Sequence, residues 1–303
     1  MNAPGNKRTA PENRMKAADI LIESLPYIRQ FSGKTIVVKY GGHAMVDTRL
    51  KEDFASDITL LKYVGINPVV VHGGGPQINK VLDAMGIVPK FVRGMRYTDD
   101  KIMDVVEMVL GGKVNKEIVA QINRAGGRAA GLSGKDGSLI LAEKMTIYKE
   151  TQGKNPPEII DPGMVGSVSK IDPSIIHTLV DNGFIPVIAP VGTGKNNETY
   201  NINADLVASK IASALQAERL ILLTDVDGLL NSRNQLMTSV DKQTINTMIR
   251  ENEIKGGMIP KMECCMEALA NRVGKAHIIN GTRPHALLLE LFTDSGIGTQ
   301  LVL

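Results

Sequence analysis

Two glycine turns in the sequence carry residue types that bind phosphate. Lys39–His43 (KYGGH) follows the β-branched run Thr35–Val38, and His72–Pro76 (HGGGP) follows Val69–Val71. A helical pattern follows each turn, and the free N–H groups at the start of a helix attract anions. The turns therefore predict a phosphate site, although glycines can also serve only to make a tight turn. Neither turn matches the common nucleotide motifs G-x-x-x-x-G-K-S/T and G-x-G-x-x-G.

Two lysines accompany glycines at opposite ends of the chain. Lys39 ends an apolar strand, where a lysine is costly unless it has an anionic partner or its ammonium group reaches solvent. Lys261 lies in the first turn of a predicted helix that the glycine loop Lys255–Gly257 enters. We expect Lys39 and Lys261 to converge across a cleft, one from each of two lobes.

Two further polar segments are candidates for the site. In Asn201–Asp205 (NINAD), Asn203 suits the N-cap of a helix and Asp205 its first turn, so Asp205 either supports the cap or holds a lysine in the cleft. In Leu223–Gly228 (LTDVDG), a strand ends at the edge where ligands bind in α/β sheets. The two aspartates of this segment either make a turn, which we favour for Asp227, or bind Mg²⁺, which we leave open for Asp225.

Arg96 belongs to the segment Val92–Thr98 (VRGMRYT). An arginine there could hold a substrate carboxylate through two parallel hydrogen bonds. The alternative for either arginine of the segment is a surface ion pair.

Composition excludes several classes of protein. The net charge of the 303 residues is +3, Trp is absent, and no Lys/Arg block of nucleic-acid type occurs. The only cysteines, Cys264 and Cys265, are adjacent, which is a poor geometry for a structural disulfide, and no Cys/His set has zinc-type spacing. With no apolar signal segment and no long apolar run, we expect a cytoplasmic protein without a membrane span.

Strands and helices alternate through most of the chain, which predicts an α/β fold with a mainly parallel sheet. We divide it into an extension (1–33), an N-terminal lobe (34–190) and a C-terminal lobe (191–303). The extension contains a polar, mobile tail over Met1–Arg14 and a helix over Ala17–Phe31 that Pro26 should kink. That helix packs either on its own domain or on another subunit. The segment Lys144–Val168 predicts hairpins and loops over a ligand site.

Five of these segments, in this order, resemble the amino acid kinase family: Lys-x-Gly-Gly, His-Gly-Gly-Gly-Pro, Asn-x-Asn-Ala-Asp, Leu-Leu-Thr-Asp-Val-x-Gly and Gly-Gly-Met-x-x-Lys. The most specific pieces are Gly94–Thr98 and Asn201–Asp205, and the resemblance runs from about Ala17 to the C-terminus. It implies a three-layer open sheet of about eight mostly parallel strands. It also implies that the N-terminal lobe binds the acceptor and dimerises, while the C-terminal lobe binds ATP.

The resemblance assigns roles residue by residue. Lys39 and Lys261 resemble the lysines on the phosphoryl oxygens in the transition state, and Asp205 the aspartate that organises both. Substrate contacts are implied for Gly41, Gly42, Gly74, Gly75, Arg96 and Asn201. Nucleotide contacts are implied for Thr224, Asp225, Gly256 and Gly257. No protein metal ligand is assigned, Mg²⁺ accompanies ATP, and His43 stands where a smaller residue is frequent, so its role is open.

Within the family, the chain resembles the branch that phosphorylates the γ-carboxylate of N-acetyl-L-glutamate. A glutamate carboxylate has an ordinary pKa of about 4.3, so the nucleophile needs no general base. Phosphoryl transfer needs positioning and positive charge, which the lysines, Mg²⁺ and glycine N–H groups would supply. The alternatives are a kinase of the same fold acting on carbamate, aspartate, glutamate, acetylaminoadipate or UMP, and a catalytically silent arginine sensor.

The two ends of the chain resemble the arginine-inhibited, hexameric members of that branch. The resemblance implies a homo-hexamer, a trimer of dimers interlaced by the N-terminal helix, with arginine bound beside that helix. It places Tyr27, His277, Glu290 and Gly296 in the effector site. From the residues alone, His277 is equally a histidine at the end of a strand.

Overall fold

The computed structural model describes residues 11–92, 94–149 and 158–303. Three predictions concern residues outside this part of the chain: the mobility of the first ten residues, the role of Arg93, and the middle of the hairpin segment. Within the described part of the chain, no helix is long and apolar enough to cross a membrane.

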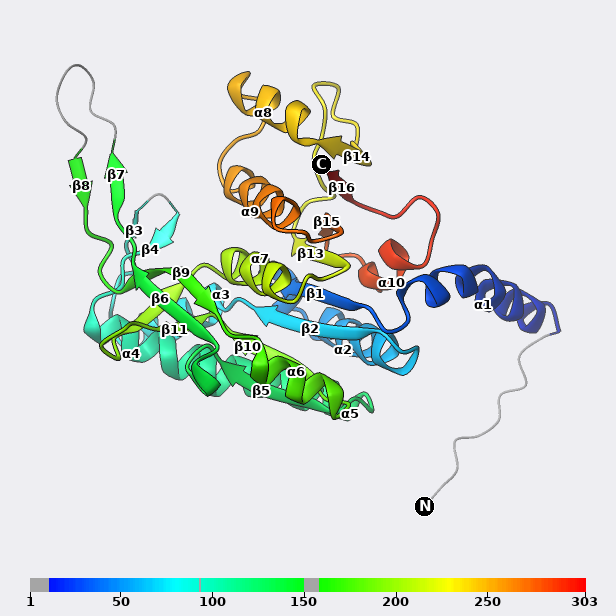
Figure 1. The fold of residues 1–303 in the computed structure, drawn as a ribbon, viewed down its shortest axis with the longest axis horizontal. Coiled ribbons are helices and arrows are strands. Elements are labelled where there is room, and N and C mark those ends of the chain that lie inside the picture. Colours follow the sequence, from blue (N-terminus) through cyan, green and yellow to red (C-terminus); the bar gives the residue numbers. More distant parts are fainter. Residues whose placement is uncertain (1–10, 93, 150–157) are drawn as a thin grey trace.

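An eight-stranded sheet forms the centre of the molecule, as the alternating pattern predicts (Figure 1). Every neighbouring pair is parallel except β15–β16. Its strands, in spatial order, are β14 (Ser239–Asp241), β16 (Thr299–Val302), β15 (Lys275–Asn280), β13 (Arg219–Thr224), β1 (Thr35–Tyr40), β2 (Asn67–His72), β10 (Ile185–Ala189) and β5 (Ala129–Ser133).

Helices cover both faces of this sheet, which gives three layers. On β1, Ile36 and Val38 join the hydrophobic core on one face and Val37 joins the core on the other. Because side chains alternate along a strand, Lys39 shares the face of Val37. The first face carries α2 (Thr48–Tyr63), α3 (Gly75–Ala84), α4 (Asp100–Glu107), α5 (Asn115–Arg124) and α10 (Ala286–Leu291). The second face carries α6 (Ser174–Asp181), α7 (Ala204–Ala214), α8 (Lys242–Arg250) and α9 (Met258–Ala270).

A second, smaller sheet and two hairpins stand beside the central sheet (Figure 1). The small sheet closes on itself through β6 (Ile140–Lys144), β9 (Val165–Ile171), β12 (Thr199–Ile202) and β11 (Val191–Thr193). The hairpins are β3 (Phe91–Val92) with β4 (Met95–Arg96), and β7 (Ile147–Lys149) with β8 (Glu158–Ile160). The β7–β8 pairing confirms that a hairpin lies within Lys144–Val168, although the end of this segment begins strand β9. Strands β11 and β12 were not predicted.

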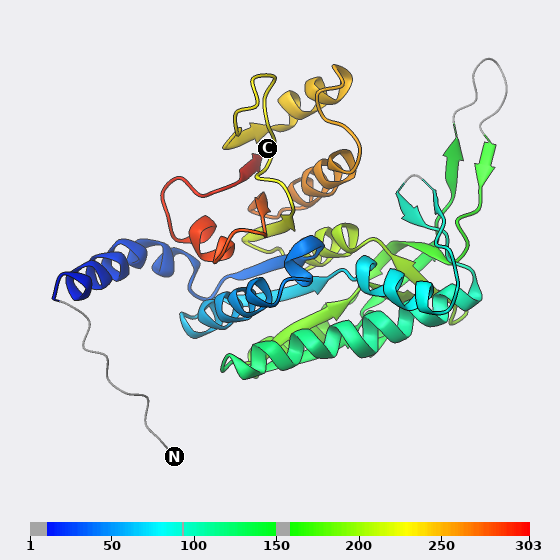
Figure 2. The same ribbon diagram turned by 180° about the vertical axis from the view of Figure 1, so that it is seen from behind.

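The N-terminal helix α1 (Pro11–Phe31) begins earlier than predicted. Pro11–Arg14, predicted as part of a mobile tail, form its first turn, where proline is tolerated because its missing N–H would have no partner there. Figures 1 and 2 show α1 extending from one end of the molecule and the β7–β8 hairpin from the other.

A π-helical turn, Met108–Val114, joins α4 to α5 and corrects another prediction. The sequence predicts two separate helices on either side of Gly111 and Gly112. Instead the backbone stays helical through both glycines, and Figure 2 shows α4 and α5 as one long rod. A π turn adds one residue to the helix and often occurs at a functional site.

Candidate active site

Lys39 and Lys261 meet at one carboxylate, as the sequence predicts. The Nζ atom of Lys39 lies 3.0 Å from Oδ1 of Asp205, and Nζ of Lys261 lies 2.6 Å from Oδ2. Lys39 comes from the end of β1, Lys261 from the first turns of α9, and Asp205 from the first turn of α7. Two ammonium groups therefore face one carboxylate, which leaves an excess of positive charge at the centre of the cleft.

The start of α7 explains the position of Asp205. The Asn203 side chain accepts hydrogen bonds from the backbone N–H groups of Asp205 and Leu206, so the predicted N-cap is confirmed. Burial opposes ionisation of Asp205, but the charges of Lys39 and Lys261 outweigh it and hold the pKa of this carboxyl below its ordinary value. Gly41 leaves room for Lys39, because a Cβ there would lie 2.7 Å from its ammonium nitrogen.

A cavity of about 200 Å³ adjoins this ion-pair cluster. Gly74, Gly75, Arg96 and Asn201, all predicted to contact substrate, are among its lining residues. Asn201 donates to the Thr98 hydroxyl at 3.3 Å. The structure thus brings four of the predicted substrate-binding residues, from three separate segments, to one pocket. The other two do not line this pocket: Gly41 lies beside Lys39, and Gly42 lies beside Asp225.

Arg96 is buried, which rules out the alternative of a surface ion pair. It is 7% exposed, and its Nη2 atom donates to Oδ1 of Asn79 at 2.5 Å. Its guanidinium carbon lies 5.0 Å from the centre of the Phe91 ring. Within the described residues, Nη1 is buried and has no hydrogen-bond partner. A free buried guanidinium nitrogen at the wall of a pocket suits a ligand carboxylate.

A second cavity, of about 920 Å³, has Asp205 and Lys261 of the ion-pair cluster in its wall. Gly256, Gly257 and Lys261 line it, and Gly94, Met95 and Asn203 line both cavities, so the two adjoin. The larger cavity borders Lys261 and the starts of α7 and α9, where helix N-termini favour an anion.

Asp225 joins the two lobes through His43. Its Oδ1 atom accepts a hydrogen bond from the His43 N–H at 2.9 Å, and its Oδ2 atom lies 2.9 Å from Nδ1 of the His43 ring. Burial opposes its ionisation, but the His43 contacts and the charge of Lys39 hold the pKa of Asp225 below its ordinary value. Thr224 ends β13 directly before it and accepts the N–H of Gly281 through its carbonyl.

Asp227 has the structural role that we favoured. Its Oδ1 accepts hydrogen bonds from Nδ2 of Asn280 at 2.9 Å and Nε of Arg283 at 3.0 Å. These bonds fasten the loop after β13 to the loop after β15.

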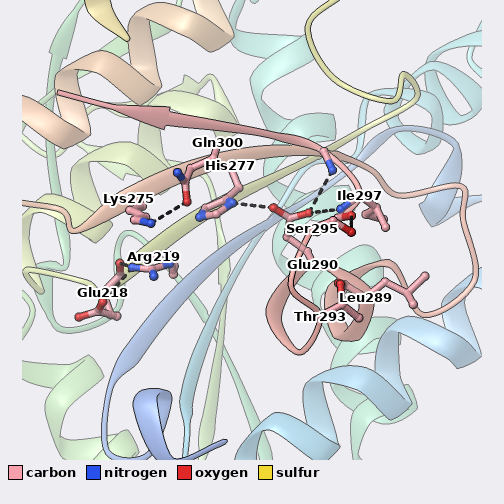
Figure 3. Close-up of polar contacts among 12 residues, drawn as sticks. Glu218, Arg219, Lys275, His277, Leu289, Glu290, Thr293, Ser295, Ile297 and Gln300 are labelled. Carbon is pink, nitrogen blue, oxygen red and sulfur yellow. Dashed lines mark hydrogen bonds and ion pairs between the residues drawn. The ribbon is translucent and has the colours of Figure 1, made fainter. Parts of the chain in front are cut away.

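Contacts connect the segments that hold the four predicted effector residues, and Figure 3 shows two of these residues, His277 and Glu290, facing each other. Nδ1 of His277 lies 2.6 Å from Oε1 of Glu290, whose Oε2 accepts the N–H groups of Ile297 and Gly298. Gly296 precedes them at φ +59°, and a Cβ there would lie 2.8 Å from Oε2 of Glu290. The Tyr27 hydroxyl donates to the Asp294 carboxylate, which brings α1 to the same segment.

Burial and hydrogen bonds act in opposite directions on the ionisation of His277 and Glu290. Burial lowers the pKa of His277 despite the hydrogen bond to Glu290. It opposes ionisation of Glu290, yet the bonds from His277, Ile297 and Gly298 hold the pKa of that carboxyl below its ordinary value. Nε2 of His277 is buried and has no partner among the described residues.

Comparison with known proteins decides the family. The model of the amino acid kinase family matches residues 34–280. The acetylglutamate kinase of Syntrophus aciditrophicus (strain SB) is 59% identical over 292 residues, covering 96% of this chain and 99% of that protein. The chain belongs to the amino acid kinase family.

Other relatives agree. The acetylglutamate kinase of Desulfotalea psychrophila is 55% identical over 96% of this chain and 98% of that protein. A solved structure of N-acetylglutamate synthase from Neisseria gonorrhoeae, complexed with coenzyme A and N-acetyl-glutamate, has a TM-score of 0.82 at 26% identity; the match covers 94% of this chain and 63% of the synthase. Carbamate kinase from Giardia lamblia, solved with AMP-PNP, shares the fold at a TM-score of 0.61 and 18% identity, covering 89% of this chain and 98% of that one.

Membership of the amino acid kinase family makes this chain a phosphotransferase that uses ATP with Mg²⁺. The described residues contain no group of three or more metal-binding side chains. Mg²⁺ is commonly held by substrate phosphates, water and one or two carboxylates. Asp225, ionised and partly exposed at the end of β13, is the carboxylate that suits this position. When bound, Mg²⁺ neutralises charge on the ATP phosphates.

Sequence reasoning missed several residues at this amino acid kinase site. Asn79, Phe91 and Leu110 contact Arg96 or line the smaller cavity, and His43 pairs with Asp225. Asn79 and Leu110 carry ordinary helical patterns, which gave no signal. The role of His43 was left open, because its partner Asp225 lies 182 residues further along the chain and the local sequence gives no signal for the contact.

Proposed function

We propose that this chain transfers the γ-phosphoryl group of ATP to the γ-carboxylate of N-acetyl-L-glutamate, in arginine biosynthesis. The carboxylate oxygen forms a bond to phosphorus, the bond between that phosphorus and ADP breaks, and ADP leaves with the electron pair. The products are N-acetyl-L-glutamyl 5-phosphate and ADP. The observation that carries this proposal is the identity of 55–59% with acetylglutamate kinases over almost the whole chain.

The site supplies what this transfer requires. Lys39 and Lys261 place two positive charges where negative charge builds up on the equatorial oxygens, and Asp205 fixes both. The acceptor is ionised at neutral pH, because its ordinary pKa is about 4.3. The side chains of the cluster therefore bind and orient, and no proton has to move.

Arg96 and Asn201 account for selection of the acceptor. The free Nη1 of Arg96 would bind the α-carboxylate, while the cavity of about 200 Å³ leaves space for a small substituted amino acid. The acceptor is tested by ADP release with N-acetylglutamate, carbamate, aspartate, glutamate, acetylaminoadipate and UMP. L-Glutamate is the matched control, since it lacks only the acetyl group. Release with another acceptor and none with N-acetylglutamate would overturn the assignment.

We also propose that arginine inhibits the enzyme by binding beside α1. In support, the Glu290 carboxylate lies against Gly296 and pairs with the buried His277, and Tyr27 joins α1 to Asp294 in the same segment. A guanidinium group pairs well with such carboxylates. Arginine would inhibit by favouring the state that holds the lobes apart, which requires tighter binding to that state. ADP release measured with and without arginine tests this, and equal rates would refute it.

A hexameric ring is the assembly that we propose for this control. Four apolar residues of α1 are exposed: Ile20, Leu21 and Ile22, at 61%, 68% and 69%, and Leu25, at 50%. Exposed apolar side chains gathered on a projecting helix favour burial against another subunit. This supports a trimer of dimers interlaced through α1, over the alternative that the helix packs on its own domain.

The rival function is an arginine sensor without activity. A sensor has no need to keep Lys39, Asp205 and Lys261 in direct contact beside an acceptor pocket. The ADP-release assay separates the two functions directly.

A further inference from the structure

His72 is a buried histidine that the reaction described above does not use. It ends β2 and is 0% exposed. Its Nδ1 atom lies 2.8 Å from the carbonyl oxygen of Gly73, and its Nε2 atom lies 3.2 Å from Nδ2 of Asn115. A carbonyl oxygen can only accept a hydrogen bond, so Nδ1 carries the proton. The lone pair of Nε2 then accepts a hydrogen bond from the Asn115 amide, and the ring is neutral.

The position of Asn115 depends on the π-helical turn. Asn115 is the first residue after Met108–Val114 and is 0% exposed. Its Nδ2 atom also lies 2.9 Å from the carbonyl oxygen of Val187 and 3.2 Å from that of Leu132, so the two N–H groups of this amide are shared among three acceptors. A plain α-helix advances 100° per residue, so one residue fewer would turn this amide away from β2. Gly131 is required for its approach, because a Cβ there would overlap Oδ1 of Asn115.

The Gly73–Gly74 peptide is the group that this arrangement fixes. The N–H of Gly73 donates to the Tyr40 carbonyl at 2.8 Å, its C=O accepts from His72, and the Gly74 carbonyl accepts from Ile78 at 2.9 Å. Among the described residues, the N–H groups of Gly74 and Gly75 have no partner. Both glycines line the cavity of about 200 Å³.

Peptide geometry connects the histidine to that free donor. A trans peptide is planar, so its C=O and N–H point in opposite directions. With the Gly73 oxygen held against the buried His72 ring, the Gly74 N–H must point away from the ring. On the other side, Leu110 and Val114 of the π turn lie against Gly74, since a Cβ there would be 2.5 Å and 3.5 Å from their side chains.

We propose that His72 is a positioning residue: held in one tautomer by Asn115, it fixes the Gly73–Gly74 peptide so that the Gly74 N–H is a preorganised donor to the transferring phosphoryl group. The π-helical turn places both Asn115 and the side chains that close on Gly74. This inference rests on the proposed function for its catalytic consequence, but not for the tautomer.

The neutral state of His72 agrees with its surroundings. Burial lowers the pKa of His72 to about 4 despite the bond to Gly73, and the nearby charge of Lys116 acts in the same direction as burial. The ring therefore stays neutral at the pH values at which the chain would work. A neutral ring with a fixed proton can aim a peptide without taking part in proton transfer.

Two substitutions separate the two bonds of the ring. Asparagine at this position can present an amide N–H where Nδ1 lies and keep the bond to Gly73, whereas glutamine can reach Asn115 but not Gly73. With N-acetylglutamate and ATP, we expect His72→Asn to retain most of kcat. His72→Gln should lose about 10²-fold or more, the usual effect of removing one oxyanion-type donor, with little change in KM. Both should fold with similar Tm values, because each keeps one of the two bonds.

The tautomer gives a test that needs no activity. In the full chain with ¹⁵N-labelled histidine, the ring nitrogens of His72 have different chemical shifts according to which carries the proton. We expect Nδ1–H in the wild type, and a mixture of tautomers in Asn115→Leu, together with a lower kcat. This second variant serves if His72→Asn fails to fold.

The possible outcomes are distinct. An imidazolium or an Nε2–H tautomer at neutral pH would overturn the inference, and so would equal kcat values for folded His72→Gln and wild type. If the wild type releases no ADP but shows the Nδ1–H tautomer, the proposed function and the catalytic role of Gly74 are wrong. The conclusion that His72 fixes the Gly73–Gly74 peptide would still hold.

Discussion

The Nζ atom of Lys261 lies 2.6 Å from Oδ2 of Asp205, so the helix α9 is fastened to the start of α7 at the centre of the cleft. The other carboxylate oxygen is occupied by Lys39 from β1. Three elements from distant parts of the chain thus share one charged cluster. Its net positive charge suits a phosphoryl group with negative charge on its oxygens.

The first prediction concerns Asp205→Asn, which keeps the shape of the side chain and removes its charge. Lys39 and Lys261 would repel each other and lose their fixed positions, so we expect kcat to fall by about 10²-fold or more. Breaking a buried ion pair should also lower the free energy of unfolding by about 3 kcal/mol. ADP release and urea unfolding measure the two effects. Wild-type kcat in the folded variant would contradict the proposed role.

The second prediction concerns Lys39→Ala. Removing one of the two cations should lower turnover by several orders of magnitude, about 10³-fold, because electrostatic stabilisation is the main contribution in phosphoryl transfer. Arginine binding, measured by calorimetry, should be unchanged, since the effector segment lies elsewhere. Lys144→Ala is the matched control: Lys144 pairs with Asp161 at the surface and is 52% exposed, so kcat should stay at the wild-type value. Normal turnover in Lys39→Ala would refute the catalytic assignment.

Much of this cluster could be predicted from the sequence because local chemistry determines it. Asn203 is an N-cap by residue type, which puts Asp205 in the first turn of α7 whatever surrounds it. The apolar runs around Lys39 and Thr224 predict buried parallel strands, and β1 and β13 are indeed neighbours. A lysine at the end of such a strand requires an anionic partner, and Asp205 provides it.

Features that depend on tertiary packing could not be predicted. The π turn over Met108–Val114 contains two glycines, which predict a break between helices, whereas its Val109, Leu110 and Val114 pack in the hydrophobic core. The pairing of β15 with β16 is antiparallel and joins short segments without a clear alternating pattern. His43 meets Asp225 because their strands are adjacent, which the local sequence does not reveal.

The third prediction concerns Gly296→Ala. Gly296 has φ +59°, where a non-glycine residue is disfavoured by about 1 kcal/mol, and the new Cβ would press on Oε2 of Glu290. We expect weaker inhibition by arginine, seen as a higher inhibitory concentration, and an unchanged kcat without arginine. Gly86→Ala has the same left-handed backbone but no neighbour within 4 Å of its Cβ, so it controls for backbone strain alone. Equal arginine sensitivity in both variants would contradict the effector assignment.

The fourth prediction concerns the N-terminal helix. Deletion of Met1–Gln30 should convert a hexamer to a dimer and weaken arginine inhibition, because it removes the exposed apolar face of α1 and the contact of Tyr27 with Asp294. Leu21→Glu with Leu25→Glu tests the same face without shortening the chain. Light scattering gives the mass of each assembly. A truncated chain that remains hexameric would exclude α1 as the link between dimers.

The fifth prediction concerns pH and the contact between α2 and α10. Nδ1 of His285 lies 2.7 Å from Oδ1 of Asp57, and Asp53 lies beside them. Burial raises the pKa of Asp57 to about 6 although the hydrogen bond from His285 lowers it. The hydrogen bond to Asp57 raises the pKa of His285, against burial.

Both shifts act on stability in the same direction. Between pH about 4 and about 6, folded Asp57 retains a proton that the unfolded chain has released, so the free energy of unfolding falls as pH rises through this range. His285 adds stability that is present below its unfolded pKa and lost as pH rises through its folded pKa. Asp57→Asn cannot titrate, so it should remove the first part of this fall, on the order of 2 kcal/mol. Urea unfolding across this pH range measures it, with Glu52→Gln, an exposed change on the same helix, as the control. If the slopes of wild type and Asp57→Asn coincide, the buried carboxyl is not the group that titrates.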